Sequence, residues 1–236
     1  MFKNSIKIAI IPARSGSKRV PKKNIKFFFN KPLIAHTIIK LRKSKIFDHV
    51  IVSTDSKKIA SISKKYGAEV PFLRPKNLSG DKPGTFQVIK HATNWLNKNG
   101  FCPEFVCCVY PTAVLLQTKD LKYGLKAIKT KKWNYVISAT TFEHPIFRSF
   151  KKNTKGKIKL IYPKKIEKST QNFENVYHDA GQFYWGKKES WLKRSKIIGP
   201  RSKMIPIPRW RTQDIDTMDD WEKAKIIFQL LKNKKK

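Results

Sequence analysis

Short apolar segments of β-strand type alternate with amphipathic segments of helical spacing along most of this chain. The strand-type segments are Lys7–Ile11, Val50–Ser53, Val70–Leu73, Phe105–Val109 and Tyr135–Ala139. The helical segments between them are Leu33–Leu41, Ile59–Tyr66, Phe86–Leu96 and Leu121–Ile128. This order predicts βαβ units, and therefore a parallel sheet with helices on both faces. Right-handed crossovers would gather the loops that follow the strands at one edge of the sheet, where ligands bind.

The segment 142–176 breaks this alternation. Lysine and asparagine residues are scattered through it, and we interpret it as an insertion that projects from the sheet. Sheet-type sequence resumes at Gly181–Gly186 and at Met204–Ile207, and Asp219–Leu231 is predicted to be the terminal helix. Thr85 is expected to cap the helix that follows it. The 236 residues therefore predict a single α/β domain with one small excursion.

A loop rich in cations and small residues follows the first predicted strand. The stretch Ile8–Asn24 reads IAIIPARSGSKRVPKKN, so Arg14, Ser17 and Lys23 come directly after an apolar run. Small residues allow backbone N–H groups to approach an anion, and the cations neutralise it. The loop contains neither G-x-x-x-x-G-K-[ST] nor G-x-G-x-x-G, so it is not a Walker P-loop or a dinucleotide fingerprint. Its position after a strand favours a polyphosphate site over a solvated basic loop.

Two carboxylates, Asp214 and Asp216, stand just before the predicted terminal helix. Alternate side chains of an extended segment point to the same side, so these two converge. Mg²⁺ prefers a few carboxylates together with phosphate oxygens and water. The alternative is a helix N-cap, formed by Asp216 or Thr217. Because the chain has only 16 acidic residues and carries a polyphosphate loop, we favour the Mg²⁺ site.

The formal net charge of +36 suggests a different class of function, namely nucleic-acid binding. The lysines are spread through nearly every segment, however, and form a clustered patch only in the tail, at Lys232 and Lys234–Lys236. This distribution favours a solvated surface that attracts anionic substrates, and a basic nucleic-acid-associated protein remains the alternative.

The cysteines and the apolar runs indicate a cytoplasmic protein. The three cysteines are odd in number and lack metal-ligand spacing, and two of them, Cys107 and Cys108, lie in an apolar run, so we expect reduced core thiols. No apolar run reaches the roughly 20 residues that span a bilayer. The start of the chain leads into the first strand without a small-residue cleavage site, so we expect neither a membrane span nor a signal peptide.

Several motifs occur together. They are IPARSGSKRVPKKN at Ile11–Asn24, VSTD at Val52–Asp55, RPKNLS at Arg74–Ser79, YPT at Tyr110–Thr112, EHP at Glu143–Pro145 and DIDT at Asp214–Thr217, with Asp81 and Thr85. With these motifs the chain resembles, nearly end to end, the CMP-sialic acid synthetase group of cytidylyltransferases, which activate acidic nine-carbon sugars. The segment Tyr177–Trp185 is most similar to the pseudaminic acid branch. The resemblance implies a Rossmann-like, doubly wound, mostly parallel sheet of nucleotidyltransferase type, with residues 142–176 as a dimerisation excursion.

The resemblance also implies roles for the residues that match the family motifs. Arg14, Ser17 and Lys23 would hold the triphosphate of CTP, with Lys23 beside the α-phosphate, where charge develops. Asn24 would support this loop or contact the nucleotide. The remaining nucleotide and metal residues implied by the match are Arg74, Pro83 and Thr85 for cytidine, and Asp214 and Asp216 for Mg²⁺. The candidates for the sugar pocket are Tyr110, Gln182 and Tyr184, with a plain core position as the alternative for Tyr184.

The implied reaction joins CTP to a 2-keto acidic sugar, giving the CMP-sugar and pyrophosphate, in a homodimer. Pseudaminic acid is the expected sugar, with legionaminate and N-acetylneuraminate as alternatives. Tyr110 stands where many sialic acid members carry Gln, which disfavours N-acetylneuraminate. Catalysis would come from positioning and charge, with Arg14, Lys23 and Asp216 as the catalytic candidates. A metal-bound hydroxide and a carboxylate such as Asp216 both stay open as the group that accepts the hydroxyl proton.

Overall fold

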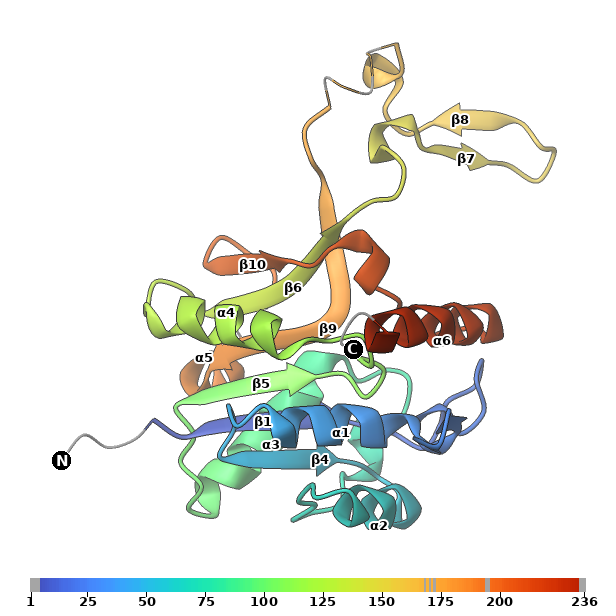
Figure 1. Cartoon of the computed structure of the whole chain (residues 1–236). Coiled ribbons are helices and arrows are strands. Elements are labelled where there is room, and N and C mark those ends of the chain that lie inside the picture. Colours follow the sequence, from blue (N-terminus) through green and yellow to red (C-terminus); the bar gives the residue numbers. More distant parts are fainter. Residues whose placement is uncertain (1–4, 168, 170, 172, 194–195, 234–236) are drawn as a thin grey trace.

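The computed structural model describes residues 5–167, 169, 171, 173–193 and 196–233. Its centre is a six-stranded sheet in the order β10-β6-β9-β5-β1-β4 (Figure 1). The strands are β1 (Lys7–Pro12), β4 (His49–Ser53), β5 (Phe105–Val109), β6 (Tyr135–Thr141), β9 (Tyr177–Lys187) and β10 (Ser202–Pro206). β1 pairs in parallel with β4 and β5, and β10 with β6, whereas β9 runs antiparallel between β5 and β6. The predicted α/β fold with a mostly parallel sheet is confirmed.

Helices cover both faces of this sheet. They are α1 (Leu33–Lys43), α2 (Lys57–Lys65), α3 (Thr85–Lys98), α4 (Thr118–Lys129), α5 (Lys188–Leu192) and α6 (Met218–Asn233). Ala9 and Ile11 of β1 belong to a buried cluster with α1, α2 and α4. Ile8 and Ile10 face the opposite way, into a cluster with α3 and α5. Because successive side chains of a strand alternate between the faces, a strand buried on both sides needs a continuous apolar run, as β1 has.

The expected strand at Val70–Leu73 is wrong. Glu69 and Leu73 make isolated parallel bridges to β4 and to the residue after it, but no strand forms between these bridges. Pro71 lies inside the segment and has no backbone N–H to donate to a ladder. An apolar composition is therefore not sufficient for a strand at this position.

Residues 142–176 leave the sheet after β6 and return to it in β9 (Figure 1). They carry a short hairpin of β7 (Phe150–Lys152) and β8 (Ile158–Leu160). Phe147 is buried against Tyr162 and Phe173, with ring centroids 5.5 and 5.1 Å away. Other apolar side chains of the hairpin are exposed, Phe150 by 57% and Ile158 by 65%. The excursion thus has a small aromatic cluster of its own and an apolar surface.

A third buried cluster joins α6 to the region after β1. The small sheet of β2 (Phe27–Phe28) and β3 (Lys31–Pro32) places Phe28 edge-on against Trp221 and Phe228 of α6, with ring centroids 5.3 and 5.4 Å apart. Ile215, which is fully buried, belongs to the same cluster. This packing holds the segment before α6 beside the loop that follows β1.

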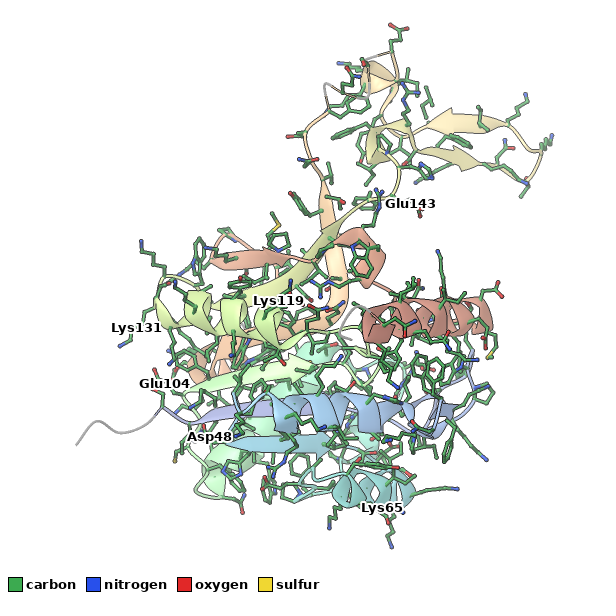
Figure 2. All side chains as sticks on the ribbon, viewed as in Figure 1. Asp48, Lys65, Glu104, Lys119, Lys131 and Glu143 are labelled. Atoms are coloured by element: carbon green, nitrogen blue, oxygen red, sulfur yellow. The ribbon has the colours of Figure 1, made fainter. Side chains whose placement is uncertain are left out.

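The positive charge is distributed over separate elements. Figure 2 shows Lys65 on α2, Lys119 on α4 and Lys131 after α4, well apart on the molecule. Lys234–Lys236 of the basic tail lie outside the described residues. Within the part of the chain that the structure describes, no helix has the length and apolar character needed to cross a membrane. All three cysteines are unpaired, and Cys107 and Cys108 are buried in β5.

Candidate active site

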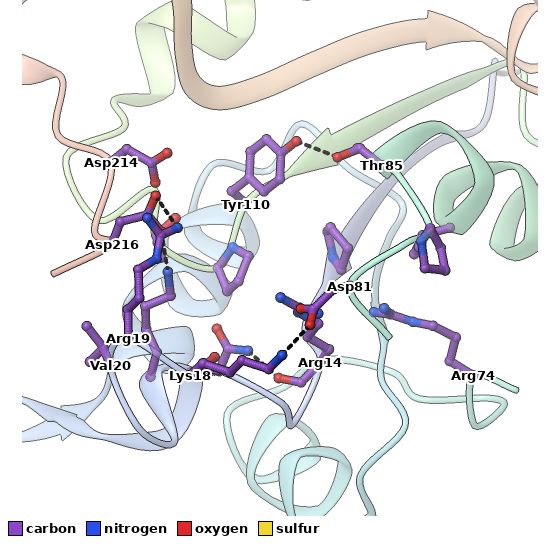
Figure 3. A pocket seen from close by; sticks show the side chains of 18 residues that line it. Arg14, Lys18, Arg19, Val20, Arg74, Asp81, Thr85, Tyr110, Asp214 and Asp216 are labelled. Atoms are coloured by element: carbon purple, nitrogen blue, oxygen red, sulfur yellow. Dashed lines mark hydrogen bonds and ion pairs between the residues drawn. The ribbon is translucent and has the colours of Figure 1, made fainter. Parts of the chain in front are cut away.

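A cavity of about 560 Å³ opens at the carboxyl ends of β1 and β5 (Figure 3). Its walls come from the loop after β1, the loop before α3, the turn after β5 and the segment before α6. The predicted site residues that line it are Arg14, Ser17, Lys23, Asn24, Arg74, Pro83, Thr85, Tyr110, Asp214 and Asp216. Residues as far apart in the sequence as Lys23 and Asp216, which are separated by 193 positions, thus meet at the sheet edge where an open α/β fold binds ligands, as the sequence predicted.

The loop after β1 is held on both sides by polar contacts. Asp55, at the end of the VSTD motif, accepts the backbone N–H of Ser15 at 2.9 Å and its hydroxyl at 2.6 Å. Asn24 Nδ2 donates to the carbonyl of Arg14 at 2.9 Å. The sequence prediction gave Asp55 no role. An acid two residues after a strand that pairs with β1 could have indicated that it contacts the loop after β1. Asp55 and Asn24 together fix the conformation that presents the cations of this loop.

Asp81 pairs with two cations of the loop. Its carboxylate lies 2.5 Å from Arg14 Nη1 and 2.7 Å from Lys18 Nζ (Figure 3). Hydrogen bonds from Lys18 and Arg14 hold the pKa of Asp81 below its usual value. The sequence motifs gave no role to Asp81, because its partner Arg14 is 67 positions away in the chain. A triphosphate that contacts Arg14 and Lys18 must share these cations with Asp81 or displace it.

Asp216 pairs with two further cations of the loop. Its carboxylate lies 2.7 Å from Arg19 Nη2 and 3.3 Å from Lys23 Nζ, and Lys23 Nζ also donates to the carbonyl of Ile215. Burial and the neighbouring charge of Asp216 raise the pKa of Asp214. Two carboxylates that repel each other at a cavity wall are the donor set that a hard cation stabilises.

The alternative explanation of the two aspartates was that they cap α6, but other residues form this cap. Thr217 precedes α6, its Oγ1 accepts the N–H of Asp220 at 3.2 Å, and Asp220 Oδ2 accepts the N–H of Thr217 at 2.8 Å. This reciprocal pair is a capping box, so the cap does not use the carboxylates of Asp214 and Asp216. Among the described residues, no group of three or more His, Cys, Asp or Glu side chains gathers as a metal site. A cation held here would complete its coordination with phosphate oxygens and water.

Arg74 and Thr85 lie on the wall predicted for cytidine. Arg74 is 6% exposed, its Nε donates to Ser53 Oγ at 3.2 Å, and burial lowers its pKa to about 10. The expected cap at Thr85 is wrong, because Gly84 precedes α3 as its N-cap and donates its N–H to Gln87 Oε1. As the first helical residue, Thr85 instead shares a hydrogen bond of 2.6 Å with the hydroxyl of Tyr110.

Of the three sugar candidates, the structure brings only Tyr110 to the cavity. Gln182 and Tyr184, both described residues, do not line it and are 3% and 5% exposed. Gln182 Nε2 donates to the carbonyl of Arg211 at 2.8 Å, and Tyr184 stacks edge-on behind Tyr110 with ring centroids 5.6 Å apart. Direct contact of Gln182 and Tyr184 with a sugar is therefore not supported. The reason is that β9 lies inside the sheet, and its part from Gln182 to Gly186 is buried.

Comparison with known proteins points to one family. Residues 8–201 match the family model described as cytidylyltransferase. The pseudaminic acid cytidylyltransferase of Campylobacter jejuni (serotype O:23/36, strain 81-176) is 39% identical, over 94% of this chain and 96% of the relative. The N-acylneuraminate cytidylyltransferase of Escherichia coli O18:K1:H7 is 33% identical, over 97% of this chain and 53% of the relative. The CMP-N,N'-diacetyllegionaminic acid synthase of Legionella pneumophila is 27% identical, over 94% of this chain and 96% of the relative.

Solved structures share the fold. CMP:2-keto-3-deoxy-manno-octonic acid synthetase, solved as a complex with CTP, superposes with a TM-score of 0.72 at 13% identity, over 96% of this chain and 100% of that one. The 4-diphosphocytidyl-2C-methyl-D-erythritol synthase of Anaerococcus prevotii superposes with a TM-score of 0.63, also at 13% identity, over 95% of this chain and 99% of that one. At this identity the likeness establishes the architecture alone.

Proposed function

Because this chain belongs to the cytidylyltransferase family, we propose that it transfers the CMP group of CTP to pseudaminic acid and releases pyrophosphate. The observation that carries this proposal is the cavity, which gathers the loop cations, Arg74, Thr85 and two aspartates in a chain 39% identical to a pseudaminic acid cytidylyltransferase. The resemblance found in the sequence is confirmed at the level of the family. We place the enzyme in the cytoplasm, where its unpaired cysteines stay reduced.

In the proposed reaction the anomeric hydroxyl of the sugar attacks the α-phosphorus of CTP. The bond to the bridging oxygen breaks, and pyrophosphate leaves with the bonding electrons. The hydroxyl proton passes to a base, for which a carboxylate such as Asp216 is a candidate. The loop after β1 supplies cations that would neutralise the phosphates, namely Arg14, Lys18, Arg19 and Lys23. Asp214 and Asp216 would hold Mg²⁺, which adds positive charge at the phosphates when bound. Because these groups are fixed before the substrates arrive, positioning and electrostatics supply most of the catalysis.

The choice of sugar is tested by incubating the protein with CTP, Mg²⁺ and each of three acids: pseudaminic, legionaminic and N-acetylneuraminic. We expect pyrophosphate release with the highest kcat/KM for pseudaminic acid. A higher kcat/KM for another acid would reassign the substrate. Nucleic-acid binding without any turnover of CTP, with an affinity that falls steeply as salt rises, would favour the alternative class.

The metal proposal predicts that Asp214→Asn and Asp216→Asn each raise the Mg²⁺ concentration for half-maximal activity about 10- to 100-fold, because a neutral amide is a poor Mg²⁺ ligand. The same shift should appear in calorimetric titrations of the protein with CTP at varied Mg²⁺, a measurement that needs no turnover. Asp219→Asn is the matched control, because Asp219 is an exposed acid in the first turn of α6 and does not line the cavity. Wild-type Mg²⁺ dependence in both aspartate variants would contradict the assignment.

We further propose that residues 142–176 join two copies of the chain. The exposed apolar side chains there are Phe150, Ile158, Ile161 and Tyr162. A two-fold axis would bury this surface against its own copy, since a C₂ interface is self-complementary. The excursion also carries cations that could reach the neighbouring copy's sugar carboxylate. Arg148 is exposed, and Lys165 Nζ lies 3.8 Å from the Phe147 ring centroid and 3.6 Å from Glu174.

Ile158→Glu is expected to convert the dimer to a monomer and to lower activity, because it places a charge in the apolar interface. Light scattering at the assay concentration measures the mass, and pyrophosphate release measures the activity. Tyr123→Glu is the control, since Tyr123 is a similarly exposed apolar residue (60%) on α4, outside the excursion. A wild-type protein that is fully active as a monomer would rule out the dimer proposal.

A further inference from the structure

Asp81 reaches across the mouth of the cavity to two cations of the loop after β1 (Figure 3). It belongs to the loop before α3, residues 79–84, which also supplies Pro83 to the cavity lining. Its Oδ1 lies 2.5 Å from Arg14 Nη1, and its Oδ2 lies 2.7 Å from Lys18 Nζ. Each carboxylate oxygen thus holds one cation, and a single side chain joins two walls of the cavity.

These two ion pairs are the polar contacts that hold the tip of the loop before α3. Within the described part of the chain, residues 80–83 make no hydrogen bond or ion pair other than those of the Asp81 side chain. Both pairs are exposed, since the side chains of Asp81 and Lys18 are 52% and 79% exposed. Exposed ion pairs contribute little stability and are screened by salt, so an incoming anion breaks this contact at small cost.

A carboxylate in this position resembles a phosphate group chemically. Both are anions whose oxygens accept from guanidinium and ammonium N–H donors. A triphosphate carries more negative charge than one carboxylate and also meets Arg19 and Lys23 in the same cavity, so it displaces Asp81 from Arg14. The displaced carboxylate stays tethered near the phosphates, and like charges at short range repel. Asp81 therefore weakens the binding of a phosphate chain without preventing it.

We propose that Asp81 is a positioning residue that competes, from within the chain, with the phosphate groups of CTP and of pyrophosphate. It holds the side chains of Arg14 and Lys18 at the cavity before CTP arrives. It returns to them when pyrophosphate leaves, and so favours product release. The identity of these two ligands rests on the proposed function, whereas the competition itself requires only a phosphate anion.

Asp81→Asn tests the competition, because it removes the charge and keeps the shape of the side chain. Calorimetric titrations without sugar, at constant ionic strength, compare inorganic tripolyphosphate, CTP and cytidine. We expect the Kd for tripolyphosphate and for CTP to fall about 3- to 10-fold, and the Kd for cytidine, which has no phosphate, to stay unchanged. The gain in affinity should shrink as salt rises. In steady-state kinetics, the inhibition constant of pyrophosphate should fall together with the KM for CTP.

Glu222→Gln is the matched control. It also removes one negative charge from an exposed ion pair, that with Lys225, and Glu222 does not line the cavity. Its Kd values should equal those of the wild type. A Kd for tripolyphosphate in Asp81→Asn that is within twofold of wild type, or weaker, would overturn the inference. A wild-type protein that binds tripolyphosphate but does not turn over CTP would overturn the proposed function and leave the competition standing, so the two failures are distinguishable.

Discussion

Replacing Lys23 with alanine is expected to lower kcat about 10²- to 10³-fold, with a much smaller change in the KM for CTP. Lys23 Nζ is held at the cavity wall by Asp216 Oδ1 at 3.3 Å and by the carbonyl of Ile215. These contacts fix the ammonium group in advance of the reaction. A contact that strengthens as charge builds on the α-phosphate lowers the barrier, so its loss appears in kcat rather than in ground-state binding.

Steady-state kinetics with varied CTP at saturating sugar separate the two effects. Lys22→Ala is the matched control. Lys22 directly precedes Lys23 in the same loop, but it does not line the cavity. It should remain close to wild type. A Lys23→Ala enzyme in which only the KM for CTP rises would make Lys23 a ground-state anchor, and its transition-state role would be wrong.

The sequence predicted those parts of the site whose functional residues lie close together along the chain. The loop around Arg14 and Lys23 follows directly on its strand, and Asp214 and Asp216 alternate along one segment, so local spacing was enough to place them. Their convergence followed from topology, because the carboxyl ends of parallel strands share one sheet edge. Continuous apolar runs likewise predicted β1 and β5, since Ile8–Ile11 and Phe105–Val109 are buried on both faces of the sheet.

The parts that the sequence did not predict depend on partners far along the chain. The pairing of Asp81 with Arg14 joins residues 67 positions apart, and nothing local to Asp81 indicates it. The apolar residues of β9 are the same whether a strand runs parallel or antiparallel, so its reversed direction was not readable. Gln182 illustrates the consequence, because an interior strand directs its amide to the carbonyl of Arg211 instead of to the cavity.

Replacing Arg211 with methionine is expected to destabilise the folded state by about 3–5 kcal/mol. Arg211 Nη1 and Nη2 donate to the two carboxylate oxygens of Asp120 at 2.7 and 3.1 Å. The two side chains are only 4% and 5% exposed, so the substitution leaves a buried carboxylate without its counter-charge. Since a domain is stable by only about 5–15 kcal/mol in total, this is a large fraction of its stability. Chemical denaturation followed by circular dichroism measures the change.

Two controls separate the unpaired charge from the loss of the side chain. Lys225→Met removes one partner of the exposed pair Lys225–Glu222, whose atoms are 2.9 Å apart, and should change the stability by less than about 1 kcal/mol. The double variant Asp120→Leu with Arg211→Met should recover part of the loss, because no charge is then buried alone. A single Arg211→Met variant within about 1 kcal/mol of wild type would show that water or another group reaches Asp120.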